Sequence, residues 1–246
     1  MARPVAAAGP CGWVERLDAR AQRRTAPTLT LAIPLVVPAG MRVLFPMLAR
    51  RLGARRGYLA GFAAYWAGCY LIPLTLLGRR RIWALLREPP GPLPRPRWLG
   101  ALALLVPPLG AVGTELLPAL RGADPALVAT AGAMAAVNAT GEELLWRGLF
   151  VAAFPDDAVR GWLWPAIGFT AWHLAPTSVR PARQGRMFLV GSALIGAGFG
   201  WVAWRTRSLR LTLPAHLVTD ASGLPAARFW LGRQSTSSEH RSAYRP

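Results

Sequence analysis

Three short groups of polar side chains lie in strongly apolar parts of this 246-residue chain. They are Glu142-Glu143-x-x-x-Arg147, Phe169-x-x-x-His173 and His216-x-x-x-Asp220. An ionisable side chain at mid-membrane costs about 2.5–3.5 kcal/mol on insertion scales, so it usually faces a bundle interior or a water-filled cavity. A carboxylate can take a proton from water, while imidazoles can stabilise an oxyanion or bind a metal. The three groups together indicate a hydrolytic site.

The spacing within two of the groups predicts which side chains meet. Glu143 and Arg147 are four residues apart, so on a helix they share a face and can pair. Glu142 is rotated by about 100° from its neighbour, which leaves it free to face something other than the arginine. His216 and Asp220 are one helical turn apart, and Asp220 could orient the imidazole through a hydrogen bond.

Each group alone also has a simpler explanation. A Glu–Arg pair at this spacing is often a salt bridge at a helix end. A single membrane histidine often only packs and forms hydrogen bonds, and Asp220 could cap a helix or snorkel to the interface. The occurrence of all three groups on separate apolar segments favours one shared site.

The composition is that of a membrane protein. Of the residues, 53% are hydrophobic and 16% charged, whereas soluble domains carry about 25% charged residues. The net charge is +18, and all 29 basic residues are arginines, which suggests bacterial coding bias. The arginines cluster between apolar blocks, where they meet lipid headgroups, so no nucleic-acid partner is expected. The two cysteines form no CxxC pair, which argues against a thiolate metal site or a disulfide framework.

About 20 apolar residues cross a bilayer, and seven segments approach that length. They are roughly 28–48, 57–77, 99–119, 125–154, 161–177, 187–204 and 209–231. The fourth is expected to start with Asp124 as N-cap and Pro125 in the first turn. We therefore predict an all-α, polytopic membrane bundle of about six to eight transmembrane helices.

The remaining segments divide the chain. Residues 1–26 are predicted to be a polar N-terminal tail, 27–232 the bundle and 233–246 a disordered C-terminal tail. The Arg- and Pro-rich stretch 78–98 is too charged to cross and is expected to be a cytoplasmic loop or a helix on the headgroups. We expect a multi-pass protein of the bacterial inner or plasma membrane.

The motifs "EELLWR", "FTAWH" and "HLVTD" resemble those of the CPBP intramembrane proteases, also called the CAAX-protease, bacteriocin-processing or Abi family. The family pattern is EExxxR, FxxxH and HxxxN or HxxxD on successive membrane helices. The resemblance covers about residues 100–232. Asp220 stands where Asn is the commoner family residue, which leaves its exact role open.

The resemblance implies a role for each matching residue. Glu142 would activate water, Glu143 would be held by Arg147 and support the site with Phe169, and His173, His216 and Asp220 would complete the catalytic cavity. Family members have been described both as metalloproteases and as glutamate-activated proteases without a tightly held metal. The cofactor is therefore either none or a divalent metal such as zinc, with Glu142, His173 and His216 as the expected ligands.

The expected function is an intramembrane endopeptidase acting on peptide or membrane-protein substrates among membrane lipids. No HExxH motif occurs, which excludes a standard zincin. Two other classes stay open. One is a non-catalytic membrane scaffold or immunity protein with the same bundle. The other is a proton-coupled transporter whose buried Glu and His relay protons.

Overall fold

Helices make up nearly all of the chain that the structure describes, and no strand occurs there. The structure is a computed structural model that describes residues 11–179 and 185–233, with side chains from residue 27 onward except 185–187. The prediction of an all-α membrane bundle is confirmed. The elements are α1 (Cys11–Leu52), α2 (Ala54–Arg87), α3 (Arg97–Ala111), η1 (Val112–Leu116), α4 (Leu117–Leu120), α5 (Pro125–Glu142), η2 (Glu143–Gly148), α6 (Leu149–Ala153), η3 (Val159–Leu163), α7 (Trp164–Trp172), α8 (Leu174–Thr177), α9 (Gly185–Thr206), α10 (Thr212–Ala221) and α11 (Leu224–Trp230).

Four helices in the described part of the chain are long and apolar enough to cross a membrane. They are Pro27–Leu52, Ala54–Arg87, Arg97–Leu120 and Phe188–Thr206, and they correspond to the first, second, third and sixth predicted spans. The other three predicted spans are also helical but are divided into shorter elements that carry the polar motifs. Their crossing of the membrane stays a prediction, as does the total number of spans.

The first two helices extend beyond their predicted limits. α1 begins at Cys11, inside the expected N-terminal tail, and continues through Pro34, Pro38 and Pro46. Prolines are tolerated in membrane helices because neighbouring groups satisfy the freed carbonyls. α2 continues past a non-helical Gly78, with φ 76°, into a helix that ends at Arg87. The first half of the 78–98 segment is thus helical. Residues 1–10 and 234–246 of the predicted tails lie outside the described residues.

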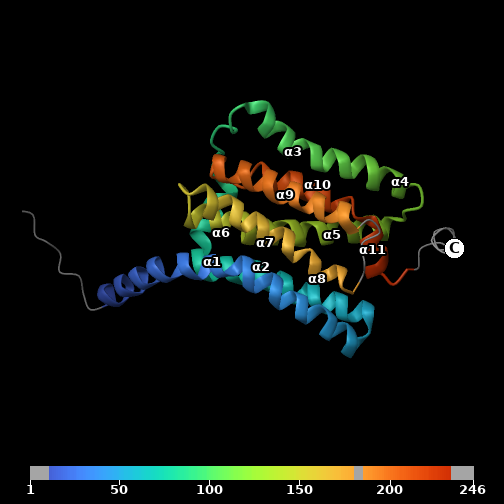
Figure 1. Cartoon of the computed structure of the whole chain (residues 1–246), viewed down its shortest axis with the longest axis horizontal. Coiled ribbons are helices and arrows are strands. Elements are labelled where there is room, and N and C mark those ends of the chain that lie inside the picture. Colours follow the sequence, from blue (N-terminus) through green and yellow to red (C-terminus); the bar gives the residue numbers. More distant parts are fainter. Residues whose placement is uncertain (1–10, 180–184, 234–246) are drawn as a thin grey trace, which may run out of the picture.

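One nearly continuous helix, formed by α5, η2 and α6, runs through the middle of the bundle. Figure 1 shows it between the α1–α2 pair on one side and α9, α10 and the outer α3 on the other. It starts as predicted: the Asp124 side chain accepts a hydrogen bond from the Leu127 amide, and Pro125 follows. Every residue from Gly141 to Phe150 is buried. The polar EExxxR motif therefore lies in the protein interior rather than in lipid.

Small side chains allow neighbouring helices to approach this central helix. Ala131, Ala135 and Ala139 recur every four residues along α5 and are buried, while α10 and α11 pack against that helix. Small residues at such spacing permit close helix contact. The packing brings the His216-bearing helix α10 beside the carboxylates of α5 and η2.

The Gly168→Ala variant is expected to destabilise the bundle where α7 meets α1. A Cβ atom at Gly168 would lie 2.6 Å from the Cβ of Pro34 and 2.7 Å from the Cζ3 of Trp146. Such overpacking costs about 1–3 kcal/mol, which a denaturation curve of the purified protein in detergent would measure. The matched control is Gly132→Ala, where a Cβ meets nothing within 4 Å. A loss of stability no larger than the control's would contradict the packing described here.

Candidate active site

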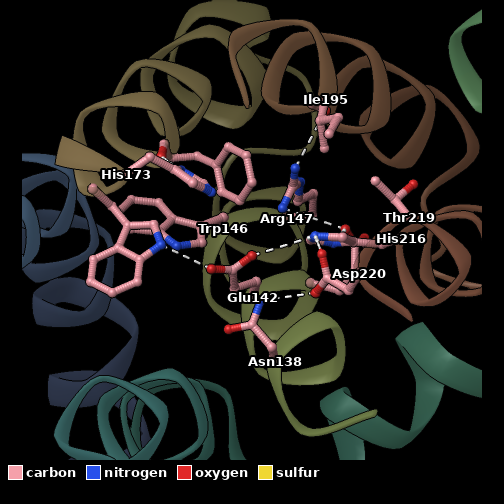
Figure 2. A network of polar contacts seen from close by, with 12 residues as sticks. Asn138, Glu142, Trp146, Arg147, His173, Ile195, His216, Thr219 and Asp220 are labelled. Atoms are coloured by element: carbon pink, nitrogen blue, oxygen red, sulfur yellow. Dashed lines mark hydrogen bonds and ion pairs between the residues drawn. The ribbon is translucent and has the colours of Figure 1, made fainter. Parts of the chain in front are cut away.

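Glu142 lies in the bundle interior with its carboxylate held in one orientation. Its side chain is 2% exposed, and its Oε1 atom accepts hydrogen bonds from the Tyr65 hydroxyl at 3.0 Å and the Trp172 indole at 2.9 Å. The Tyr65 hydroxyl in turn accepts from the Trp146 indole at 2.8 Å. An indole N–H can only donate, so the Tyr65 proton is directed at Glu142. The second oxygen, Oε2, points away from these donors and toward His216 (Figure 2).

Glu143 makes a separate set of buried contacts. Its Oε1 lies 3.4 Å from Nη1 of Arg147 and 2.9 Å from Nδ1 of His216, and its Oε2 accepts from the Thr212 hydroxyl at 2.5 Å. The predicted pairing of Glu143 with Arg147 is confirmed. Arg147 also donates to the Ile195 carbonyl, at 3.3 Å, and stacks over the Phe169 ring, 4.2 Å from its centroid. The contacts of Arg147 thus connect η2 with α7 and α9.

The backbone of η2 is a π-helical turn over Glu143–Gly148. Turns of this kind are rare and often occur at functional sites. Both glutamates lie at its start: Glu142 ends α5, and Glu143 begins the turn. The two neighbouring carboxylates consequently differ in most of their partners, as the sequence predicts, although both contact His216.

His216 stands between three carboxylates. Its Nδ1 contacts Glu143, while its Nε2 lies 3.4 Å from Oε2 of Glu142 and 3.6 Å from Oδ1 of Asp220. The sequence suggests that Asp220 orients the imidazole, but the structure places the orienting contact at Glu143. Asp220 is too far from Nε2 for a good hydrogen bond. It accepts one instead from the Asn138 amide, at 2.9 Å on Oδ2 (Figure 2).

His173 lies on the other side of Glu142 from His216 in Figure 2. Its Nδ1 is 2.7 Å from the carbonyl oxygen of Phe169, four residues earlier. A carbonyl only accepts, so Nδ1 carries a proton and donates it. The Nε2 atom of His173 is then the ring nitrogen left for other partners.

The predicted residues therefore gather around Glu142, although not all in the same way. Among the described residues, Glu142, His216 and Asp220 each offer a ligand atom, and these atoms lie within 4.8 Å of one another. His173 is not in that group, which differs from the metal trio expected from the sequence. The Phe169 ring packs edge-on against both histidine rings, with centroid distances of 4.6 Å to His173 and 6.1 Å to His216.

Residues 124–222 match the protein family described as type II CAAX prenyl endopeptidase, Rce1-like. This segment is therefore an Rce1-like domain. The resemblance to the CAAX-protease family is thereby confirmed. No curated protein and no solved structure gives a significant match to the chain.

The Rce1-like domain runs from the N-cap of α5 to the residue after α10, so it contains the central helix and all three motifs. At the level of the family, it is a membrane endopeptidase, a hydrolase of peptide bonds. Together with the four long apolar helices, this makes the chain an integral membrane protein. Helices α1 to α4 and α11 lie outside the matched segment.

Several residues that orient the motif side chains were not singled out from the sequence. Tyr65 and Trp66 lie on α2, outside the Rce1-like domain, where no spacing connects them to the motifs. Asn138 and Thr212 could have been found. Asn138 is one turn before Glu142 and Thr212 one turn before His216, and a polar residue in an apolar helix at that spacing shares the face of the motif residue.

Proposed function

We propose that the Rce1-like domain hydrolyses peptide bonds of membrane-associated substrates with a water molecule activated by Glu142. The observation that carries this proposal is the orientation of the Glu142 carboxylate. Two donors hold Oε1, so Oε2 is the oxygen directed at His216. A carboxylate held in this way suits a general base, because little reorganisation is needed when it takes a proton.

The reaction follows from the groups around this oxygen. Oε2 of Glu142 takes one proton from water as the water oxygen bonds to the peptide carbonyl carbon. The carbonyl oxygen becomes an oxyanion, which His216 stabilises in its protonated form, with its Nδ1–H on Glu143 and its Nε2–H directed at the site. The oxyanion then collapses, the C–N bond breaks, and the proton on Glu142 passes to the leaving amine.

The surrounding residues hold the His216 ring in place and leave an approach to Glu142 for water and substrate. Glu143, Arg147 and Thr212 fix the ring of His216 through buried contacts. Asp220 is 22% exposed and His173 is partly buried. Water and the substrate therefore have an approach from the side of these two residues, while Glu142 stays inside.

The compactness of the polar cluster favours an enzyme over a transporter. Within the described residues, the fully buried acidic, arginine and histidine side chains of the bundle are Glu142, Glu143, Arg147 and His216, and they contact one another. A proton pathway would require ionisable groups spread across the membrane thickness. In the part of the chain that the structure describes, no row of buried acidic or basic groups extends from this cluster.

The test is reconstitution of the purified chain in liposomes with a panel of membrane-anchored peptides, analysed by mass spectrometry. We expect two fragments from one cleaved bond. A scaffold or immunity protein would leave every peptide intact. Proton-coupled uptake of a solute without cleavage would favour the transporter.

The Tyr65→Phe variant is expected to retain the fold and lose activity. It removes the O–H that donates to Glu142 and leaves the Trp146 indole without its acceptor. A hydrogen bond to a charged group contributes about 1.5–3 kcal/mol, which corresponds to a kcat/KM lower by about 10- to 150-fold. Tyr70→Phe is the control, since its hydroxyl donates to the Val137 carbonyl, away from Glu142. Equal kinetics of the two variants would refute the role of Tyr65.

A further inference from the structure

A cavity of about 440 Å³ opens at one end of the bundle, and none of the motif residues lines it. Its walls come from the last turns of α2, from the end of α6 with the turn that follows, and from the turn after α9. This is the end of the bundle at which α6 is labelled in Figure 1. Ligand pockets commonly measure about 300–1,000 Å³, so the cavity has room for a small molecule or a lipid headgroup.

One wall of the cavity is a single face of α2 and its C-terminal end. Arg81, Ala84, Leu85 and Glu88 line it, and residues with this i, i+3, i+4 and i+7 spacing lie on one side of a helix. The alanine and the leucine lie between the two charged residues. The face is therefore apolar in the middle, with a cation at one end and an anion at the other.

The opposite wall has the same character. Val151, Ala152 and Pro155 supply its apolar part, and Asp156 and Arg207 complete the lining. Val151 is 3% exposed, whereas all four charged residues of the lining are exposed. The cavity thus has an apolar floor and a charged rim that carries two arginines and two carboxylates.

Two of the four charged groups on the rim are unpaired. Nη2 of Arg207 lies 3.1 Å from Oδ1 of Asp156, but these side chains are 43% and 94% exposed, and exposed pairs contribute little to stability. Within the part of the chain that the structure describes, the side chains of Arg81 and Glu88 form no ion pair. The rim therefore offers a free cation and a free anion together with a weak pair.

The cavity lies where helices of membrane-spanning length end. The helix Phe188–Thr206 ends one residue before Arg207. The Arg207 guanidinium lies over the Trp204 ring, 5.7 Å from its centroid, and Arg87 lies 4.0 Å from the centroid of Trp83. Tryptophan and arginine gather where helices leave the hydrocarbon of the bilayer. The charged rim is therefore at the level of the lipid headgroups.

We propose that this cavity binds the headgroup of a phospholipid with a primary amine, of the phosphatidylethanolamine class. Arg81 and Arg207 donate hydrogen bonds to the phosphate, because a guanidinium matches phosphate oxygens with paired N–H donors. The ammonium group carries N–H donors as a lysine side chain does, and it donates to Glu88 and Asp156. Each charge of the zwitterionic headgroup thus meets the opposite charge on the rim.

The carboxylates select this headgroup over the headgroups of other lipids. An anionic headgroup without an amine brings a phosphate to the arginines but leaves Glu88 near a negative charge. A choline headgroup is zwitterionic, but its quaternary ammonium has no N–H with which to donate a hydrogen bond to a carboxylate. A primary ammonium both neutralises the carboxylates and forms charge-assisted hydrogen bonds with them.

The cavity floor connects the headgroup site with the helix that carries the two glutamates. Leu85 and Val151 belong to one buried apolar cluster with Leu144, which follows Glu143 in the sequence. A lipid bound to this floor stabilises the folded chain, because a ligand of the folded state alone shifts the unfolding equilibrium. The inference is independent of the proposed function, since it concerns lipid binding outside the polar motifs.

The test is lipid binding by the full chain, delipidated in detergent and analysed by native mass spectrometry. The probes are phosphatidylethanolamine, phosphatidylcholine and phosphatidylglycerol with the same acyl chains. We expect one phosphatidylethanolamine per chain, bound about 10-fold or more tightly than the other two lipids. The midpoint of thermal unfolding should rise more with phosphatidylethanolamine than with either of them.

Arg81→Gln is expected to weaken the binding of phosphatidylethanolamine about 10-fold or more, because it removes a charged donor to the phosphate. Glu88→Gln is expected to reduce the preference over phosphatidylglycerol, because it removes an acceptor of the ammonium. Both side chains are exposed, so both variants should fold. Arg80→Gln is the matched control, since Arg80 is exposed and does not line the cavity. It should bind like the wild type.

Equal binding of the three lipids by the wild type would overturn the inference. So would equal losses in Arg80→Gln and Arg81→Gln, or an unchanged lipid preference in Glu88→Gln. Water-soluble glycerophosphoethanolamine carries the same charges without acyl chains, and we expect that an equal concentration does not displace the lipid. Displacement at equal concentration would contradict the assignment of a membrane lipid as the ligand.

Discussion

The Glu142→Gln variant is expected to remain folded and to lose peptidase activity by about 10²- to 10⁴-fold in kcat, the contribution typical of a positioned general base. Glutamine retains a carbonyl oxygen that can accept from Tyr65 and Trp172. Its amide cannot take a proton from water. The measurement is the cleavage rate of a membrane-anchored peptide in liposomes at saturating substrate.

The control for this variant is Glu115→Gln. Glu115 is exposed on η1 and lies outside the polar cluster. The control should cleave at the wild-type rate, because the same chemical change is made away from the site. Similar rates for the two variants would remove Glu142 from the mechanism.

The second large effect is expected from Arg147→Met, which removes the positive charge beside Glu143. Both side chains are at most 1% exposed, and the Glu143 contacts to His216 and Thr212 remain. Breaking a buried pair by removing one partner costs about 3–5 kcal/mol, because the other charge is left buried without compensation. The free energy of unfolding in detergent should fall by this amount.

Arg160→Met provides the matched comparison on the protein surface. Arg160 pairs with Asp157 at 2.6 Å, with side chains 53% and 32% exposed. Exposed pairs of this kind contribute about 0–1 kcal/mol. Adding Glu143→Met to Arg147→Met should recover part of the lost stability, since no isolated charge then remains. If Arg147→Met were as mild as Arg160→Met, the buried pair would have no structural role.

Local spacing predicted the parts of the site that depend on one helix. Hydropathy located the apolar segments, the N-cap signal placed the start of α5 at Pro125, and the four-residue spacing predicted the ion pair of Glu143 with Arg147. These features depend on helical periodicity alone. The sequence predicts them because the 3.6 residues of each helical turn determine which residues share a helix face.

Contacts between helices could not be derived in the same way. Nothing in the spacing places Tyr65 next to Glu142, 77 residues later, because the register of α2 against α5 depends on packing. The spacing also could not show that Glu143, rather than Asp220, orients the His216 ring. Glu143 contacts Nδ1 because the π-helical turn and α10 lie side by side. Asp220 then faces the other ring nitrogen.

The direct test of the account is one turnover of the wild-type protein and Glu142→Gln in water enriched in ¹⁸O, with a membrane-anchored peptide as substrate. The account predicts that the wild type yields one new peptide carboxylate carrying a single ¹⁸O atom, and that Glu142→Gln yields neither fragment in the same time. Cleavage at the wild-type rate by Glu142→Gln, or no cleavage by the wild type of any peptide tested, would contradict it.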